Sequence, residues 1–421
     1  MSVDNSADPT TLHHALIDDL VERNLITSPP VEAAFRAVRR QHFLPELPPE
    51  KVYEDRAIPT KMDGSGRPIS SSSQPAIMAI MLEQLDLQPG HHVLEIGAGT
   101  GYNAALMAHI AGGQGSVTTV DIDDDLVEAA RTNLAAAGFD EVAVICGDGM
   151  FGHPGNAPYD RIILTVAGWD IPPEWLAQLK PDGRLVLPLS FYGPQLSIAF
   201  ERRDGHLASH SVKACGFVPV RGPRSEPLHK IQIGAGWDAI LMEIPGGQTR
   251  APDPAVLAAR LRQPYQEQPT GLELTAGELL FKWQLWFGLH EPQLVLFSAA
   301  RQEETEDLVP DLLPPWGVNS GILAGSSLAI LAPPLGTGAP PPGDDNPFAR
   351  TIPLHIRSYG PDHTVARRLL RRLHAWDEAG RPPHETTSVR ALPAGHSPAS
   401  TADATLTRRW HHYCIWWGNA A

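Results

Sequence analysis

The sequence has few cysteines, no long apolar run and no excess of basic residues. Its 421 residues include only Cys146, Cys215 and Cys414, with no C-x-x-C spacing, so neither a disulfide framework nor a zinc ribbon is indicated. The most apolar stretch, residues 321–333, is too short to span a bilayer. The first residues, MSVDNSADPTT, lack the basic and apolar regions of a secretory signal. We therefore expect a cytoplasmic protein with no membrane partner.

Acidic residues outnumber basic residues, mostly in the first half of the chain. There are 33 Lys and Arg against 48 Asp and Glu, a formal net charge of −15. This balance argues against a nucleic-acid partner, which would require a basic surface. Residues 1–229 hold 17 basic and 29 acidic side chains, whereas residues 230–421 hold 16 and 19. A chain of 421 residues is long enough for two or three domains, so we expect two parts with different roles.

The first half predicts a parallel α/β sheet, because strands alternate with helices. The predicted strands are 91–96, 116–121, 142–146, 161–166 and 183–188, and the predicted helices are 102–111, 124–137 and a segment that includes 176–179. Such alternation is typical of βαβ units in an open, doubly wound sheet. Upstream, the pattern predicts helices over 11–24, 31–38 and 76–85, and a polar loop over 46–68.

The pattern changes after residue 217. Short apolar runs follow, with predicted strands at 328–331, 352–356 and 410–417, a helix over 363–376 and a proline- and glycine-rich loop over 333–347. This mixture predicts an α+β extension. We therefore divide the chain into a first domain, residues 1–225, and an extension, residues 226–421.

Three turns that follow predicted parallel strands suggest one ligand site. Residues 97–101 are Gly-Ala-Gly-Thr-Gly, Asp121 ends the next strand 20 residues after Gly101, and residues 147–149 are Gly-Asp-Gly. A glycine turn lets the backbone approach a ligand, and an acid at that distance commonly binds ribose hydroxyls. Because parallel strands end at the same edge of a sheet, the three turns are expected to lie together.

The glycine spacing distinguishes two candidate cofactors, NAD and S-adenosylmethionine. A dinucleotide site is typical of G-x-G-x-x-G, where a helix N-terminus binds the diphosphate. Here the third glycine comes one residue early, at position 101. S-adenosylmethionine has no diphosphate to bind, so the spacing favours it as the cofactor.

The first domain resembles the protein-L-isoaspartate O-methyltransferases. The resemblance covers about residues 1–225 and rests on Ile69–Pro75 ahead of a helix, VLEIGAGTGYNAALMA at 93–108, GDG at 147–149, APYDRIILT at 157–165, LKPDGRLVLPL at 179–189 and FVPV at 217–220. The Ser-Gln-Pro segment at 73–75 makes it specific, since methyltransferases in general lack it. The resemblance implies a Rossmann-like class I methyltransferase domain that uses S-adenosylmethionine.

The resemblance also implies roles for individual residues. In the family, the serine of the Ser-x-Pro segment orients the substrate carboxylate, so Ser73 is the implied catalytic residue. Of the implied cofactor residues, Asp121 matches the ribose carboxylate and Asp148 with Gly149 the adenine-side pair. The full implied cofactor set is Ser70, Ser71, Ser72, Glu95, Gly97, Gly99, Gly101, Asp121, Asp148 and Gly149.

Two departures and the extension suggest a special branch of the family. The lead Ile-Ser-Ser-Ser-Ser at 69–73 is unusually rich in serine, and residues 165–170 are Thr-Val-Ala-Gly-Trp-Asp where repair enzymes tend to have small residues. The extension resembles that of the FxLD-type, lanthipeptide- or graspetide-associated branch. Members of that branch methylate an aspartate in a ribosomally made, modified peptide, and the ester closes to an aspartimide.

We therefore predict an enzyme that esterifies an aspartate of a modified precursor peptide, giving an aspartimide that can hydrolyse to isoaspartate. The alternative enzyme is a protein-L-isoaspartate repair methyltransferase, which by resemblance needs only the first domain. The alternative from another class is a catalytically silent peptide-binding scaffold. Competent residues at the cofactor positions and at Ser73 favour the enzyme.

Two remaining patterns concern metals and the extension. Adjacent histidines at 13–14, 91–92 and 411–412 would point to opposite faces of a strand, so we predict no metal site. On a helical wheel of 363–376, four arginines lie opposite the apolar arc. We predict that two of these, Arg368 and Arg372, bind acidic side chains of the peptide.

Overall fold

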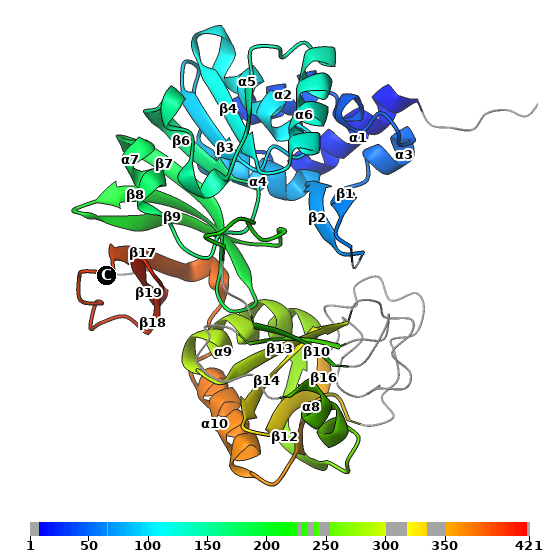
Figure 1. The fold of residues 1–421 in the computed structure, drawn as a ribbon, viewed down its shortest axis with the longest axis vertical. Helices are drawn as coiled ribbons and strands as arrows, with labels where there is room; N and C mark the ends of the chain where they lie inside the picture. Colours follow the sequence, from blue (N-terminus) through cyan, green and yellow to red (C-terminus); the bar gives the residue numbers. More distant parts are fainter. Residues whose placement is uncertain are drawn as a thin grey trace, which may run out of the picture. The chain divides into compact units, whose positions relative to one another are not determined.

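The computed structural model describes residues 8–64, 66–225, 229–233, 240–244, 253–299, 318–334 and 351–418 (Figure 1). The chain divides into two units. The first comprises Met1–Ser190, Gln195–Ser225 and Ser388–Trp416, and the second Phe191–Pro194, Glu226–Thr387 and Trp417–Ala421. Within the described ranges, no helix combines the length and the apolar character needed to cross a membrane.

A mixed sheet of ten strands, counted over the described residues, forms the centre of the first unit. Its order is β18-β19-β17-β9-β8-β7-β6-β3-β4-β5. The bounds are β3 (His92–Ile96), β4 (Ser116–Asp121), β5 (Ala143–Cys146), β6 (Tyr159–Leu164), β7 (Leu179–Ser190), β8 (Gln195–Arg203), β9 (His206–Cys215), β17 (Thr387–Pro393), β18 (Ala404–Thr407) and β19 (His411–Trp417). The pairs β4–β5, β3–β4, β3–β6 and β6–β7 are parallel, which confirms the predicted doubly wound α/β fold.

Helices accompany the parallel part of this sheet (Figure 1). They are α1 (Pro9–Glu22), α2 (Pro29–Ala37), α3 (Pro49–Val52), α4 (Pro75–Leu85), α5 (Tyr102–Ala111), α6 (Asp124–Ala136) and α7 (Pro173–Gln178), with short 3-10 turns at Arg40–Phe43, Gly112–Gln114, Gly149–Phe151 and Pro154–Asn156. Several begin with proline, whose missing N–H is not needed in a first turn. Ala, Leu and Met side chains of α4 and α5 are buried in one core with the strands.

A hairpin replaces part of the loop that we predicted over 46–68. β1 (Ile58–Met62) pairs antiparallel with β2 (Pro68–Ser72), so most of the serine lead is a strand. Ser70 and Ser72 are buried. Hydrophobic periodicity missed this hairpin because a run of serines has no apolar face, whereas the backbone bonds to β1 stabilise the strand regardless of side chain.

The last strands return to the first unit, which corrects the domain boundary. We assigned all of 226–421 to the extension, but Ser388–Trp416 belongs to the first unit, where β17 pairs with β9. The fully buried Asp170 accepts hydrogen bonds from the Tyr413 hydroxyl and the Trp410 backbone N–H, each at 2.7 Å. Local sequence patterns cannot reveal a pairing between strands so far apart along the chain.

The second unit has a seven-stranded antiparallel sheet in its described part, which agrees with the predicted α+β extension. The order is β10 (His229–Ile233), β11 (Ile240–Ile244), β13 (Leu294–Ala299), β14 (Val318–Ala324), β15 (Ser327–Ala332), β16 (Thr351–Tyr359) and β12 (Gln266–Thr275). The helices are α8 (Pro254–Leu261), α9 (Gln284–His290) and α10 (Thr364–Glu378), with a π-helix at Glu278–Trp283 and a 3-10 turn at His384–Thr386. α10 confirms the helix predicted over 363–376. Residues 335–347 of the predicted loop lie outside the described residues.

Candidate functional site

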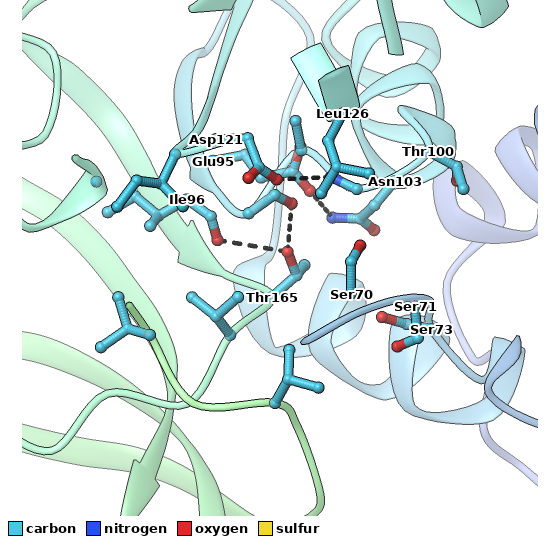
Figure 2. A pocket seen from close by; sticks show the side chains of 18 of the residues that line it. Ser70, Ser71, Ser73, Glu95, Ile96, Thr100, Asn103, Asp121, Leu126 and Thr165 are labelled. Carbon is cyan, nitrogen blue, oxygen red and sulfur yellow. Dashed lines mark hydrogen bonds between the residues drawn. The ribbon is translucent and has the colours of Figure 1, made fainter. Parts of the chain in front are cut away.

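A pocket of about 760 Å³, including space open to solvent, lies where β3, β4 and β6 end (Figure 2). Its lining comes mainly from the serine segment 69–73, residues 95–100, residues 120–122, Thr165-Val166 and residues 218–221. The carboxyl edge of an open parallel sheet is where such folds bind ligands.

The glycine turn after β3 forms part of the pocket wall. Gly97 and Gly99 line the pocket and have φ angles of 104° and 51°, which residues with a side chain rarely adopt. A Cβ at Gly97 would lie 2.7 Å from Oγ1 of Thr165. A Cβ at Gly99 would lie 3.5 Å from the carbonyl oxygen of Ser71. Gly97 therefore permits the close approach of Thr165, and Gly99 permits the positive φ that the turn requires beside Ser71.

Asp121 places a carboxylate at the end of β4. Its Oδ2 accepts a hydrogen bond from the backbone N–H of Gly99 at 3.1 Å, and its Oδ1 accepts one from that of Asp123 at 3.3 Å. These bonds hold the carboxylate beside the glycine turn, as Figure 2 shows. Because Asp121 also lines the pocket, its remaining lone pairs can accept hydrogen bonds from the hydroxyls of a ligand.

Glu95 is a fully buried acid in the same pocket wall. Its carboxylate accepts hydrogen bonds from Nδ2 of Asn103 at 2.8 Å and from Oγ1 of Thr119 at 2.7 Å. Burial raises the pKa of Glu95 to about 7, and the negative charge of Asp121 adds to the rise. Each oxygen already has a protein donor, so Glu95 mainly holds α5 and β4 against the pocket.

Two of the residues assigned to the cofactor do not line the pocket. A Cβ at Gly101 would lie 3.1 Å from Leu134, so this glycine permits α6 to pack closely instead. Asp148 accepts a hydrogen bond from the Met150 backbone N–H through Oδ1, while its buried Oδ2 has no partner among the described residues. Its neighbour Gly149 does line the pocket. An unpaired buried oxygen beside a pocket residue is suited to a donor group of a ligand.

The serine segment 70–73 lines the pocket throughout, but its hydroxyls differ in their partners. The Ser70 hydroxyl accepts a hydrogen bond from Oγ1 of Thr60 at 3.0 Å, and the Ser72 hydroxyl one from Arg40 at 3.4 Å. The hydroxyls of the other two serines bond to no residue that the structure describes. The structure thus separates two hydroxyls that already accept a hydrogen bond from the protein from two that bond to no described residue and are available to a ligand.

Sequence reasoning missed residues that carry no motif of their own. Oγ1 of Thr165 donates to the carbonyl oxygen of Gly97 at 2.6 Å, which supports the glycine turn. Arg221 lines the pocket and binds Asp123 through both terminal nitrogens. Arg40 is fully buried beneath the serine segment, although an arginine in a polar stretch normally indicates a surface. In the sequence, Thr165 ends the APYDRIILT segment at 157–165 and Arg221 follows the FVPV segment at 217–220, so these two segments were the signals near them.

The two arginines predicted to bind a peptide have partners within the second unit. Nη2 of Arg368 lies 3.1 Å from Oε1 of Glu291, and Nε of Arg372 lies 3.3 Å from Oε2. The Glu291 side chain is only 1% exposed. The pair therefore neutralises a buried carboxylate, which would otherwise be strongly destabilising. Peptide binding by these arginines stays a prediction.

The histidine pairs have separate partners. Nε2 of His13 lies 3.2 Å from the carbonyl oxygen of Arg36, whereas Nδ1 of His411 lies 3.3 Å from Asp170. Across the described part of the chain, no three His, Cys, Asp or Glu side chains are grouped so as to hold a metal ion.

Comparison with known proteins identifies relatives of the first unit. The family model described as protein-L-isoaspartate(D-aspartate) O-methyltransferase matches residues 11–225. A protein-L-isoaspartate O-methyltransferase from Hyperthermus butylicus is 42% identical over 216 residues, which are 49% of this chain and 87% of the relative. One from Methanopyrus kandleri is 39% identical over 209 residues, 49% of this chain and 90% of the relative. A solved structure described by the same name covers 90% of this chain and 96% of its own, with a TM-score of 0.49 and 23% identity.

Proposed function

The chain belongs to the protein-L-isoaspartate(D-aspartate) O-methyltransferase family, and on this premise we propose that it methylates an isoaspartyl carboxylate of a protein or peptide in the pocket of its first unit. S-adenosylmethionine is the cofactor of this protein carboxyl O-methyltransferase and supplies the methyl group from a sulfonium. The observation that carries the proposal is the pocket itself, which brings an anchored carboxylate, a glycine turn and two available hydroxyls together.

The residues present fit the cofactor. Asp121 would accept hydrogen bonds from the two ribose hydroxyls, since its carboxylate is held in place by backbone donors and faces the pocket. The unpaired Oδ2 of Asp148 would accept one from the adenine amine. Gly97 and Gly99 line the same pocket and adopt the positive φ angles of its glycine turn.

The acceptor requires orientation rather than a base. A carboxylate with a pKa near ~4 is already ionised at neutral pH and can attack a methyl group directly. The Ser73 hydroxyl would donate a hydrogen bond to one oxygen and leave the other free to attack. Because the carboxylate and sulfonium charges disappear together, a full positive charge beside the acceptor would stabilise the reactants more than the transition state. A neutral hydroxyl avoids this effect.

Single-turnover methylation of an isoaspartyl peptide tests the proposal. Ser73→Ala should lower the rate about tenfold or more through lost orientation, while the affinity for S-adenosylhomocysteine stays unchanged. Ser116→Ala is the matched control, because Ser116 is an exposed serine of the same unit and does not line the pocket. A Ser73→Ala rate within about twofold of wild type would remove Ser73 from the acceptor site.

The second unit favours a second proposal with a different acceptor. The two relatives align over 49% of this chain but over 87% and 90% of their own lengths, so the match leaves half of this chain unaccounted for. In this second proposal the partner is a ribosomally made, modified precursor peptide, and the acceptor is an L-aspartate side chain. The next backbone nitrogen then attacks the ester carbonyl, the C–OCH3 bond breaks, and methanol leaves with the amide proton. The product is a succinimide.

Mass spectrometry distinguishes the two acceptors. A cyclised aspartyl peptide should first gain the mass of a CH2 group and then lose that of methanol. Methylation confined to linear isoaspartyl peptides would support the repair reaction instead. Binding of S-adenosylhomocysteine without methyl transfer to either peptide would leave only the scaffold interpretation.

A further inference from the structure

Arg40 is a buried cation whose position suggests more than support of the core. It begins the 3-10 turn Arg40–Phe43, and its side chain is 0% exposed. Burying a charged group is unfavourable unless its hydrogen bonds are replaced. The partners of Arg40 therefore indicate what it contributes.

The guanidinium of Arg40 joins two segments of the first unit. Nη1 donates to the carbonyl oxygens of Val52 at 2.8 Å and Glu54 at 3.2 Å, and Nη2 donates to those of Arg56 at 3.2 Å, Ser72 at 3.3 Å and Ser73 at 2.9 Å. Apart from the Ser72 hydroxyl, every acceptor is a backbone carbonyl. Among the described residues, no carboxylate lies within hydrogen-bond distance of the guanidinium. Its hydrogen bonds therefore fix the conformation of the backbone.

The hydrogen bonds of Arg40 explain why the hydroxyls of Ser71 and Ser73 are available to a ligand. Side chains alternate between the two faces of an extended segment. The Ser72 hydroxyl lies 3.4 Å from Arg40, so those of Ser71 and Ser73 are directed to the other face. Both residues line the pocket, and Figure 2 shows their side chains on the same side of it.

Asp55 holds the chain directly after Ser73. Its Oδ1 accepts a hydrogen bond from the Ala76 backbone N–H at 2.9 Å, and its carbonyl oxygen accepts one from Nε2 of Gln74 at 3.1 Å. Arg40 therefore holds the carbonyl group of Ser73, and Asp55 holds the residues that follow it.

We propose that Arg40 is a positioning residue for methyl transfer. It turns the carbonyl groups of Ser72 and Ser73 into the protein, and the Ser73 hydroxyl is thereby presented to the acceptor carboxylate. This inference rests on the proposed function of Ser73. The cation acts through the backbone, so the acceptor meets a neutral hydroxyl rather than a charge that would oppose the loss of charge during transfer.

A double-mutant cycle between Arg40 and Ser73 tests the inference. Arg40→Lys keeps the charge but lacks the planar fork that reaches several carbonyls. We expect kcat for an isoaspartyl peptide to fall about tenfold, with S-adenosylhomocysteine affinity within about twofold of wild type. In the Ser73→Ala background Arg40→Lys should have no further effect on kcat, because the hydroxyl that it positions is absent. Equal losses of kcat in both backgrounds would indicate a purely structural role and overturn the inference.

Two further variants make the result specific. Arg39→Lys is the matched control, since Arg39 bonds to Thr10 rather than to the serine segment, and should behave as wild type. If Arg40→Lys does not fold, Asp55→Ala removes the carboxylate that accepts a hydrogen bond from the Ala76 backbone N–H. Its loss of kcat should likewise vanish in the Ser73→Ala background.

The cycle also separates the inference from the function on which it rests. If Ser73→Ala loses activity but Arg40→Lys and Asp55→Ala keep the wild-type kcat, the inference fails and the proposed function stands. If Ser73→Ala itself keeps the wild-type kcat, the proposed role of Ser73 fails, and the positioning role fails with it.

Discussion

Glu95 of the first unit and Glu291 of the second are both buried acidic side chains, and the two are stabilised in opposite ways. Glu95 of the first unit accepts hydrogen bonds from neutral groups, an amide and a hydroxyl, and its pKa is raised to about 7. Glu291 of the second unit contacts two guanidinium groups. A carboxylate between cations is neutralised where it lies. A carboxylate with neutral donors instead keeps a perturbed pKa, which is commonly found at functional sites.

The sheets of the two units also differ, and the difference bears on ligand binding. The parallel strands of the first unit end at one edge, where the backbone groups and loop residues of several strands converge on the pocket. The antiparallel strands of the second unit alternate in direction, so no edge gathers strand ends of one kind. The comparison implies that ligand binding depends on the first unit and that the charged pairs of the second unit maintain its fold.

The largest expected effect is the loss of cofactor binding in Asp121→Ala. Two charge-assisted hydrogen bonds of about 1.5–3 kcal/mol each would be lost. Affinity should therefore fall roughly a hundredfold to ten-thousandfold, as each 1.4 kcal/mol is tenfold. Titration calorimetry with S-adenosylhomocysteine measures this. Glu291→Gln is the control in the second unit and should keep the wild-type affinity; an unchanged constant in Asp121→Ala would remove Asp121 from the site.

Removing both cations from Glu291 should strongly destabilise the second unit. Arg368→Met with Arg372→Met leaves an unpaired buried carboxylate, which typically costs about 3–5 kcal/mol. Differential scanning calorimetry should show the transition that does not respond to S-adenosylhomocysteine moving to lower temperature. Arg367→Met with Arg371→Met is the matched control, since both side chains are exposed on the same helix. Unchanged stability together with a raised KM for a peptide would favour the predicted peptide-binding role.

The raised pKa of Glu95 predicts a pH dependence of the first unit. The folded state binds this proton more tightly than the unfolded state, so the contribution of Glu95 to stability is fully present below pH 4.5 and is lost as pH rises to about 7. Glu95→Gln should flatten this part of the profile of unfolding free energy against pH. The change should be a few kcal/mol at most, since one pKa unit is worth about 1.4 kcal/mol. An identical profile in the variant would contradict the assignment.

A smaller effect tests the division into units. Tyr413→Phe removes one hydrogen bond to the buried Asp170 and should cost about 1–3 kcal/mol. Because Tyr413 belongs to the returning segment Ser388–Trp416, the transition that S-adenosylhomocysteine stabilises should be the one that shifts. A shift confined to the other transition would place this segment in the second unit.

Short-range sequence patterns predicted the parallel strands of the first unit and one helix of the second. The alternation over 91–188 predicted the parallel strands, and the amphipathic pattern over 363–376 predicted α10. The glycine turn and Asp121 were expected at one edge because strand ends converge there, and both line the pocket. The same reasoning missed the hairpin, since Ser70–Ser72 has no apolar periodicity, and it missed Arg40, whose burial depends on carbonyl groups from distant segments.

The sequence by itself determined the class of the first unit, the spacing of its glycine turn and the residue types at the strand ends. These follow from short-range periodicity and turn chemistry, which act within a few residues. Only the tertiary structure decided which serine hydroxyls are available, that Arg368 and Arg372 are paired with Glu291, and that the last strands join the first sheet. Each of these depends on contacts between residues far apart in the chain, and their free energy comes from burial and pairing that no local pattern records.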